Sequence, residues 1–465
     1  MIAWTCLAFP GSLHADLQAH LFPGDGLEAA AVLVCARTPG PRLRLIVKHV
    51  ILVPHDACKQ RTVDTITWPS DFVEQAIAVG EDEGHVLVPI HSHPGGLFDF
   101  SEADDRSDRE LLPCIFQAYG EAHGSAIMTP DGSVRARLYN RAMKVTPISA
   151  AMVIGDDIRI WWCDGATLTG PAPRPIAFTA GMTSELARLT AVVIGVSGTG
   201  SIIAEQVARL GFGRVVLIDF DLVELKNLNR ILNATTADAN AERNKARMFA
   251  DAVATYRGED VALAVPMSIA ERDAVLAASQ GDVLFSCVDT LEARHLADRI
   301  AAAFAIPLFD VGVTIPTRMS PKGAQIADVC GRIDYVQPGG STLKDRRIYT
   351  ADTLQAEYDR KADPVGHQQQ IDAGYIKGIV EEAPAVIALN MRAASACVLE
   401  FIARQYPFRH EPNRLYAQTR FSLAVGDETL MAEDDFGRSA NPILAVGAQE
   451  PLLGLPRLAR PAGAL

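Results

Sequence analysis

Apolar residues in the first third of the chain recur in short blocks, and their spacing predicts a mixed α+β domain. Strands are expected at residues 28–37, 42–53, 85–93, 125–128 and 133–138. Helices are expected at 70–81 and 101–112. Ser70 and Ser101 are suitable N-caps for these helices, and acidic residues in the first turn favour the second one.

A different pattern begins near residue 180, where short apolar blocks alternate with helical stretches. Strands are expected at residues 191–195, 214–219, 281–287 and 306–311, with helices at 183–189 and 201–210. This alternation predicts an α/β domain with a parallel, doubly wound, Rossmann-like sheet. Because residues 155–175 are rich in Gly and Pro, the chain is expected to divide into a first domain, a linker, a second domain and a C-terminal tail, at 1–150, 151–180, 181–445 and 446–465.

Length and charge narrow the class of protein. The chain has 465 residues, more than one hydrophobic core supports. The formal net charge of −13 argues against nucleic acid or an anionic membrane as a partner. No apolar stretch is long enough to span a membrane, and the N-terminus lacks the features of a signal peptide. Eight cysteines without any C-x-x-C pair suit reduced thiols, so a cytoplasmic protein is expected.

A candidate metal site follows the strand at 85–93. Alternate residues of a strand share a face, so His91 and His93 can reach one metal ion, and Asp104 can add an oxygen ligand. Three protein ligands plus water are typical of catalytic zinc, which needs a general base nearby. Glu28, on a separate strand, is the best-placed carboxylate. Glu74, Glu81 and Glu83 remain alternatives, and an isolated H-x-H is often merely structural.

These residues stand in the order Glu28, then His91-Ser92-His93-Pro94, then Ser101 and Asp104. The order resembles the JAMM motif of JAB/MPN metallopeptidases, E…H-x-H-P…S-x-x-D, over about residues 27–139. The resemblance implies that His91, His93 and Asp104 ligate Zn²⁺, that Glu28 is the base, and that Ser101 helps to hold the oxyanion. The remaining acids of the helix start, Asp99, Asp105 and Asp108, are expected to be solvated.

A candidate nucleotide site lies at the start of the second domain. Gly195, Gly198 and Gly200 follow an expected strand and open a helix, and glycines there let the backbone approach phosphates at the helix N-terminus. Asp219 follows 19 residues after Gly200, at the end of the next expected strand. That spacing suits an acid that binds a ribose hydroxyl, and an NAD-dependent enzyme would have the same pattern.

Basic residues further along favour ATP over NAD. Arg230 and Lys245 follow the strand that carries Asp219, and Asp289 follows a later strand. Cleavage of ATP between its α and β phosphates builds negative charge on pyrophosphate, which such cations stabilise. Asp289 can hold Mg²⁺ against the same phosphates. Each cation taken singly is also consistent with ordinary surface charge.

The run from residue 181 to 421 resembles the ThiF/MoeB family and the adenylation domains of ubiquitin-activating enzymes. The shared pattern is a G-x-G-G-x-G-like loop, D-x-D-x-V-x-x-x-N-L-N-R, a Lys, and an Asp after C-x-D; here Ser197 replaces one glycine. The resemblance implies ATP at the loop, ribose at Asp219, phosphates at Asn227, Arg230 and Lys245, and Mg²⁺ at Asp289. It also implies a homodimer that adenylates the C-terminal carboxylate of a ubiquitin-like protein.

Two departures from that family concern cysteine. Relatives often carry two C-x-x-C pairs that bind a structural zinc, whereas residues 335–346 contain no cysteine, so no metal is expected in this domain. Cys287 and Cys397 lie in apolar surroundings and are expected in the core. Cys330, in a loop-like context, is the only candidate for a thioester cysteine. Otherwise the chain is expected either to stop at the acyl-adenylate or to transfer the acyl group to a cysteine of a partner.

The fusion of the two patterns suggests a common substrate. We expect a ubiquitin-like protein with a Gly-Gly tail, which the metal domain trims or releases and the second domain adenylates. A separate conjugating enzyme is the implied partner. Two alternatives stay open: activation and processing of a sulfur carrier, and a non-catalytic scaffold.

Overall fold

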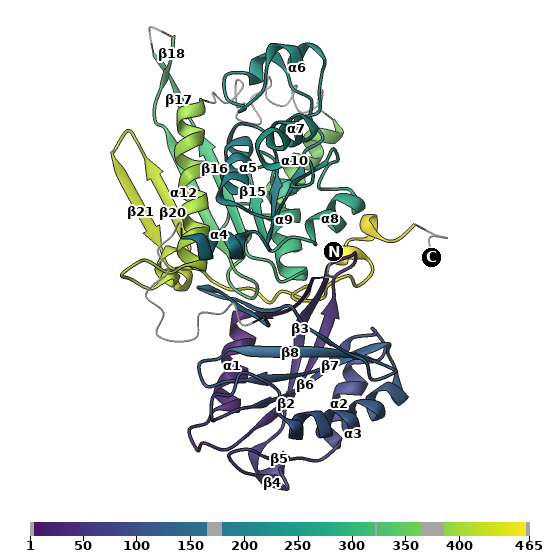
Figure 1. The fold of residues 1–465 in the computed structure, drawn as a ribbon. Coiled ribbons are helices and arrows are strands. Elements are labelled where there is room, and N and C mark those ends of the chain that lie inside the picture. The colour runs from purple at the N-terminus through teal and green to yellow at the C-terminus, as the bar shows by residue number, and fades with distance from the viewer. Residues whose placement is uncertain (1–3, 165–178, 321–322, 364–385, 462–465) are drawn as a thin grey trace.

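The computed structural model describes residues 4–164, 179–320, 323–363 and 386–461, and these form two α/β units that meet end to end (Figure 1). Each unit is built around its own sheet, as expected from the change of pattern near residue 180. Among the described residues, no helix is long and apolar enough to cross a membrane.

The first unit contains a nine-stranded mixed sheet, with the strand order β11-β10-β1-β3-β2-β6-β7-β8-β9. Its strands are β1 (Thr5–Pro10), β2 (Ala30–Arg37), β3 (Leu43–Leu52), β6 (Val86–Ser92), β7 (Ala122–Met128), β8 (Val134–Asn140), β9 (Val145–Pro147), β10 (Ala150–Ile154) and β11 (Ile158–Trp162). A separate small hairpin is formed by β4 (Gln60–Arg61) and β5 (Ile66–Thr67).

Helices cover both faces of this sheet. They are α1 (Gly11–Leu21), α2 (Asp71–Gly80) and α3 (Glu102–Ala118). The alternation along β2 explains the two layers: Val32 and Val34 pack with α2 and α3, whereas Leu33 and Cys35 face the core that contains α1. All four side chains are buried, because both faces of the strand meet apolar surfaces.

The second unit contains an eight-stranded sheet in the order β14-β13-β12-β15-β16-β19-β20-β21. Its strands are β12 (Thr190–Ile194), β13 (Arg214–Ile218), β14 (Ala262–Val265), β15 (Val283–Ser286), β16 (Leu308–Thr314), β19 (Cys330–Val336), β20 (Gln418–Ser422) and β21 (Asp427–Met431). The first five are parallel, and the last three extend the sheet with antiparallel pairs. β17 (Thr317–Ser320) and β18 (Gly323–Ile326) form a hairpin of their own.

Helices pack on both faces of the parallel part, as in a doubly wound fold. The helices are α4 (Ala180–Leu186), α5 (Gly198–Leu210), α6 (Thr236–Asn240), α7 (Lys245–Arg257), α8 (Arg272–Ala278), α9 (Leu291–Ala303), α10 (Ala351–Ala362) and α12 (Ile387–Gln405). One apolar core contains α5, α7 and α12, and the other contains α8 and α9. Short 3₁₀ helices are η1 (His55–Ala57), η2 (Leu225–Asn227), η3 (Asn413–Tyr416), η4 (Glu433–Asp435), η5 (Leu452–Gly454) and η6 (Pro456–Leu458).

The structure differs from the expected linker at 151–180. The first part of that range forms most of β10 and all of β11, which add to the first sheet beside β1, and residues 165–178 lie outside the described ranges. β10 joins the sheet because its residues are apolar, and all five of them are buried.

The expected tail at 446–465 also differs, as far as it is described. Leu452, Leu453 and Leu458 are buried in the same core as α8 and α9, so this segment is part of the second unit rather than a free end.

The two units meet where β3 begins and where β12 and β15 begin. Arg44 Nη1 lies 3.3 Å from Asp282 Oδ1, and Arg42 Nη2 lies 2.9 Å from Asp282 Oδ2. The C-terminal segment crosses the same junction, because the Ala448 amide donates to the Arg37 carbonyl at 2.9 Å and the Gly447 amide to the Ala303 carbonyl at 2.8 Å. The junction is therefore held by buried ion pairs and by the backbone at Gly447 and Ala448, which we call the backbone strap.

Candidate functional site

Two histidines meet at the end of β6. His91 belongs to the strand, and the amide of His93, just beyond it, donates to the Met128 carbonyl of β7 at 2.8 Å. The Nε2 atoms of the two rings lie 3.1 Å apart. Nδ1 of His93 bonds the Leu97 carbonyl at 2.8 Å. Because a carbonyl can only accept, Nδ1 carries the proton, which leaves a lone pair on Nε2.

Asp104 reaches both imidazoles from the first turn of α3. Its Oδ1 lies 3.0 Å from His91 Nε2, and its Oδ2 lies 3.5 Å from His93 Nε2. Ser101 is the N-cap of this helix: its hydroxyl accepts from the Asp104 amide at 3.2 Å, and its own amide donates to Asp104 Oδ2 at 2.6 Å. This capping box orients the carboxylate toward the histidines.

Glu28 is a second carboxylate close to the two histidines. It lies just before β2 and is buried, and ligand atoms of Glu28, His91 and His93 all lie within 4.8 Å of one another. The Glu28 amide donates to the Thr62 carbonyl at 2.8 Å, and Arg61 Nε donates to the Glu28 carbonyl at 2.8 Å.

The three alternative acids lie elsewhere. Glu74 is exposed on α2, and Glu81 and Glu83 precede β6, at the opposite end of that strand from His91. Glu83 instead contacts Lys48 Nζ at 2.9 Å.

The pKa values in this cluster are shifted by burial and by mutual contacts. Burial raises the pKa of Glu28, although both histidines oppose the shift. Burial opposes ionisation of Asp104, but hydrogen bonds from His91 and His93 outweigh it and hold the Asp104 pKa well below its usual range. Burial likewise works against a charged His93, yet bonds to Asp104 and Leu97 raise its pKa. Two imidazoles with one or two carboxylates form a donor set suited to Zn²⁺.

Two neighbours of this cluster were not singled out from the sequence. The Ser92 hydroxyl accepts from the Ala29 amide at 2.8 Å, which ties the start of β2 to the end of β6 and so fixes Glu28 beside the histidines. Asp108, expected in solvent, is buried and accepts hydrogen bonds from Ser125, Arg137 and Tyr139. Its position in α3 places it on the inward face, which a first-turn charge pattern alone does not reveal.

The glycine loop lies at the point where the strand order reverses. β12 is flanked by β13 on one side and β15 on the other, and crevices at such switch points bind ligands in open α/β sheets. Gly195 follows β12 with a φ of +85°, and a side chain there would press against the Cys287 carbonyl that follows β15. A Cβ at Gly200 would collide with the Gly195 carbonyl. The tight turn that opens α5 therefore requires both glycines.

Asp219, which follows the adjacent strand β13, accepts a hydrogen bond from the glycine turn. Its Oδ2 accepts from the Val196 amide at 2.6 Å and its Oδ1 from the Asp221 amide at 2.9 Å. Burial raises the pKa of Asp219, while Lys245 opposes the shift. Lys245, the first residue of α7, is buried and contacts Asp221 Oδ2 at 2.8 Å.

Asn244, not identified from the sequence, holds Lys245 at this place. Its side chain caps α7 by accepting from the Arg247 amide and donates to the Asp219 carbonyl at 2.9 Å.

Of the other expected residues, Arg230 lies beside the loop, Asn227 is buried and Asp289 is exposed. Asn227 is buried, and its Oδ1 accepts from the Glu224 amide at 3.1 Å. Arg230 Nη1 donates to the Lys226 carbonyl at 3.1 Å, while its alkyl chain lies beside Gly198. Asp289 is exposed just beyond β15.

Asn390, in the first turn of α12, also contacts the loop, although no sequence signal marked it. A Cβ at Gly198 would collide with the Asn390 amide, and Asn390 is only 2% exposed. Its Oδ1 is buried and has no hydrogen-bond partner among the residues that the structure describes. Because residue 198 is a glycine, there is room beside it for the amide of Asn390, which lies almost 200 residues away in the sequence.

The three cysteines considered in the second domain occupy structural positions. Cys397 is buried in α12, and burial raises the pKa of Cys287. Cys330 is not in a loop: it begins β19, between Thr314 of β16 and Ser422 of β20. Burial, with a hydrogen bond to Asp328, raises the pKa of Cys330 to about 11, which disfavours the thiolate needed for a nucleophile.

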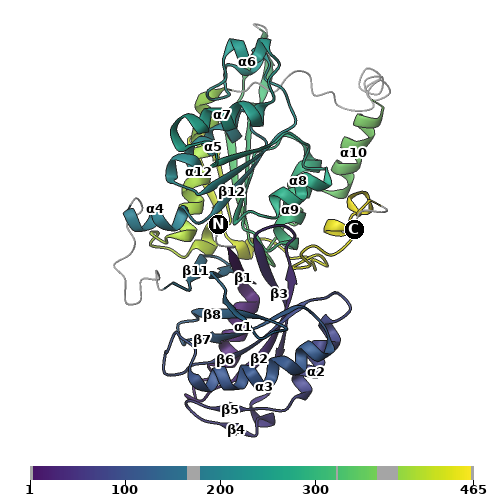
Figure 2. The same ribbon diagram turned by 45° about the vertical axis from the view of Figure 1, so that its right-hand side comes forward.

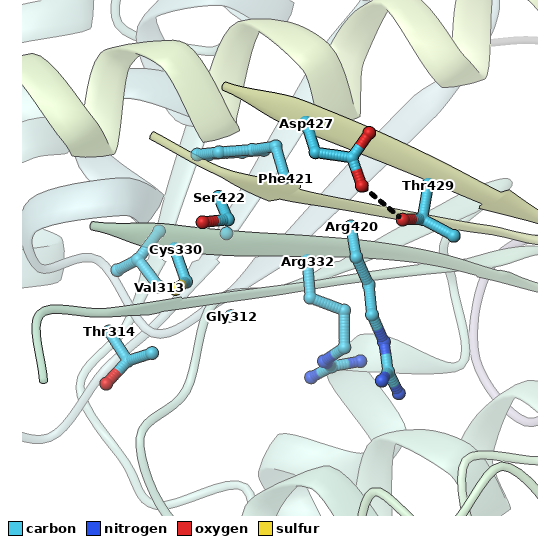
Figure 3. A pocket seen from close by; sticks show the side chains of 11 residues that line it. Gly312, Val313, Thr314, Cys330, Arg332, Arg420, Phe421, Ser422, Asp427 and Thr429 are labelled. Atoms are coloured by element: carbon cyan, nitrogen blue, oxygen red, sulfur yellow. Dashed lines mark hydrogen bonds between the residues drawn. The ribbon is translucent and has the colours of Figure 1, made fainter. Parts of the chain in front are cut away.

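A cavity of about 470 Å³ opens over the outer strands of the second sheet (Figure 3). Arg332 and Arg420 extend side by side along its wall, and Phe421 also lines it (Figure 3). The guanidinium of Arg332 also contacts Asp310 Oδ2 at 2.7 Å, so one of the two cations is anchored by a fully buried acid.

Both units match known families. Residues 10–163 match the family described as prokaryotic homologs of the JAB domain, and residues 174–402 match the ThiF family. The chain is therefore a JAB domain fused to a ThiF-family domain, which confirms the family resemblance and the fold class expected from the sequence.

Individual relatives cover only part of the chain. Ubiquitin-like modifier-activating enzyme 5 of Drosophila pseudoobscura pseudoobscura is 28% identical over 163 residues, which cover 32% of this chain and 37% of the relative. Adenylyltransferase and sulfurtransferase MOCS3 of Mus musculus is 32% identical over 124 residues, 27% of this chain and 26% of the relative. The chain thus spans less than two fifths of either relative. The crystal structure of E. coli MccB with ATP aligns with a TM-score of 0.41 and 16% identity, over 57% of this chain and 68% of that chain.

Proposed function

We propose that this chain processes and activates a small ubiquitin-like protein that ends in Gly-Gly. The JAB domain, which we take to extend to about residue 163, would cleave the amide after the tail, and the ThiF-family domain would adenylate the carboxylate so produced. The observation that carries this proposal is the convergence of Glu28, His91 and His93 in a chain that also has a glycine turn at a sheet switch point.

In the JAB domain, His91, His93 and Asp104 would hold Zn²⁺. Zinc supplies a water acidified toward a pKa of ~7. Glu28 would accept a proton from the attacking water and deliver it to the departing amine as the C–N bond breaks, which yields a free carboxylate and an amine. Burial favours this role, because it raises the pKa of Glu28 toward the pH at which a proton is both taken and released.

Ser101 would steady the oxyanion that develops on the scissile carbonyl. Its oxygen already accepts from the Asp104 amide, while its own hydroxyl proton is bonded to no acceptor among the described residues. That proton is available for a negatively charged oxygen.

In the second domain, the turn from Gly195 to Gly200 would hold the phosphates of ATP at the N-terminus of α5. The tail carboxylate would attack the α phosphorus, forming an acyl-adenylate as the α–β bond breaks and pyrophosphate departs. Lys245, Arg230 and Asn227 would bind the phosphates and offset the charge on pyrophosphate. Asp219 would contact the ribose, and Asp289 would hold Mg²⁺.

Separate assays test the two halves. ATP–pyrophosphate exchange that depends on the mature tail should be lost in Arg230→Ala and Lys245→Ala, with Arg247→Ala of the same helix as a control. Cleavage of a tail fusion should be lost in His93→Ala or with a chelator and kept in His49→Ala. Wild-type protein without exchange would sink the adenylation claim, and cleavage retained by His93→Ala would sink the peptidase claim.

Partners follow from the same chemistry. Because the pKa values of Cys330 and Cys287 are raised and Cys397 is buried in the core, we propose that the acyl group passes to a cysteine of a separate conjugating enzyme. We also propose a homodimer, which sedimentation of the purified chain would test.

A second candidate function is activation and processing of a sulfur carrier. The likeness to an adenylyltransferase and sulfurtransferase of Mus musculus supports it. Labelled sulfur recovered on the mature tail, in the presence of a sulfurtransferase, would favour this function. Labelled tail recovered as an amide on lysine would favour conjugation instead.

A further inference from the structure

The two candidate sites lie on opposite sides of the junction between the domains. At the junction, Arg44 at the start of β3 contacts Asp282 just before β15, and the Thr190 amide at the start of β12 donates to the same carboxylate at 2.8 Å. β3 leads from this point into the first domain, and β12 leads from it into the second. The number of residues along each strand therefore gives the distance of each site from the junction.

Strand pairing places the metal cluster at the far end of the first domain. β3 pairs with β2 so that Leu52 lies opposite Ala31, and β2 pairs with β6 so that Ala30 lies opposite His91. His91 is therefore level with the end of β3, eight residues beyond Arg44. At ~3.4 Å per residue, that separation is roughly 27 Å.

The glycine turn lies at the far end of the second domain. β12 starts with Thr190 at the junction and ends with Ile194, directly before Gly195. Five steps at ~3.3 Å give roughly 17 Å in the other direction. The β4–β5 hairpin, which adjoins Glu28, and α6, which follows Arg230, lie at opposite ends of the molecule in both views (Figures 1 and 2).

The junction leaves little freedom for the domains to turn the two sites toward each other. The side chains of Arg44 and Asp282 are 3% and 2% exposed, and Arg44 also donates to the carbonyls of Gly281 and Ala305. Breaking a buried ion pair leaves an uncompensated charge, which costs several kcal/mol. The backbone strap at Gly447 and Ala448 bonds to both domains as well.

We propose that the two sites handle the tail in separate encounters, with the ubiquitin-like protein released between them. This inference rests on the proposed function. An extended peptide gains at most ~3.6 Å per residue, so bridging roughly 40 Å takes about a dozen residues, far more than a Gly-Gly end supplies. Hydrolysis in the JAB domain therefore feeds a common pool of mature protein, and the adenylating site of any chain draws on that pool.

Isotope dilution tests this inference on the full-length protein. A labelled precursor is supplied with ATP, Mg²⁺ and Zn²⁺, together with a tenfold excess of unlabelled mature protein. Release between the sites predicts that the labelled fraction of the first acyl-adenylate falls at least about elevenfold, which is the factor for labelled mature protein added directly. Label that resists dilution would overturn the proposal.

Two controls separate this inference from its premise. An equimolar mixture of His93→Ala and Lys245→Ala chains should convert precursor to adenylate at the rate of wild type at equal concentration of each site; a much slower mixture would count against release. Cleavage and pyrophosphate exchange are also measured singly, and loss of either in wild type would overturn the proposed function itself.

A binding readout needs no turnover. In hydrogen exchange, a non-hydrolysable ATP analogue should protect the amides at 195–200 and leave those at 91–104 unchanged, because the two sites are independent. Protection that spreads to 91–104 would show coupling across the junction and contradict the proposal.

Discussion

Arg44 and Asp282 form an ion pair between the two domains, with 3.3 Å between Nη1 and Oδ1 and both side chains almost fully buried. Replacing Arg44 by Met removes one partner and leaves the carboxylate in an apolar setting. Because Arg42 and the Thr190 amide still contact Asp282, we expect a loss of about 3 kcal/mol in the free energy of unfolding.

Chemical denaturation followed by a tryptophan signal would measure this loss. The double variant Arg44→Met/Asp282→Asn should lose less than the sum of the single variants, because it removes the buried carboxylate that Arg44→Met leaves short of a partner, and Arg42, the other partner of that carboxylate, is partly exposed. Lys48→Met, which removes the more exposed pair with Glu83, serves as the control and should cost about 1 kcal/mol or less. An Arg44→Met variant as stable as this control would contradict the expectation.

Asp104 is the site residue whose replacement separates metal binding from folding. Asp104→Asn keeps an oxygen that can accept from the Ser101 amide, so the capping box of α3 is largely retained. The amide is a much poorer zinc ligand than a carboxylate, and we expect zinc affinity to fall about 100-fold or more. Metal content after dialysis and thermal unfolding are measured together.

Glu102→Gln provides the matched control, since Glu102 is an exposed acid of the same turn. It should bind zinc as wild type does. If Asp104→Asn also retained a full equivalent of zinc, Asp104 would not be a ligand, and Glu28 with the two histidines would have to be the complete set.

Much of the fold could be predicted from periodicity because the buried strands consist almost entirely of apolar residues. The blocks at 28–37 and 85–93 correspond to β2 and β6 within a few residues, and Ser101 is the N-cap expected for α3. Residues 151–163 fall within the expected linker because glycine and proline follow them closely, although the stretch 158–163 is strand-like. Only pairing with β1, about 145 residues earlier, reveals that they belong to the sheet.

The residues that position the sites could not be predicted in the same way. Ser92 and Asn244 act through side-chain bonds to backbone atoms of distant segments, which leave no periodic signal. Asn390 reaches Gly198 only because α12 packs beside α5. Short motifs identify the chemistry, whereas the supporting contacts depend on tertiary packing.

Asn390 is expected to position the glycine loop that binds ATP. Its buried amide lies against Gly198, and its oxygen has no partner among the described residues, so it can accept a hydrogen bond from a hydroxyl or amino group of the bound nucleotide. Asn390→Asp brings a negative charge to the loop at almost constant volume. We expect the KM for ATP to rise at least about tenfold in pyrophosphate exchange, with a much smaller change in the KM for the tail.

Ser395→Ala is the control for Asn390→Asp, because Ser395 also joins α12 to α5, through Gln206 at 2.8 Å, but lies a turn and more away from the loop. It should leave the KM for ATP unchanged. A rise in KM that is equal for both variants would indicate a general loosening of the two helices rather than a contact with the nucleotide.

His14 should make the stability of the first domain depend on pH. Its Nε2 bonds the Gly132 carbonyl at 2.8 Å, Arg159 donates to Nδ1 at 3.3 Å, and burial lowers its pKa to about 4. The unfolded chain takes up a proton below a pKa of about 6.5, whereas the folded domain stays neutral until about 4. The free energy of unfolding is therefore highest above pH 6.5 and falls by about 3 kcal/mol as the pH drops to 4.

His14→Gln removes this titration while keeping a side-chain donor that can reach the Gly132 carbonyl. We expect the variant to be less stable than wild type at pH 7.5, and the difference between the two proteins to shrink steadily between pH 6.5 and 4. Denaturation curves at half-unit intervals of pH measure that difference, and other titrating groups cancel because both proteins share them. A difference that is constant over this range would mean that His14 already carries its proton in the folded domain.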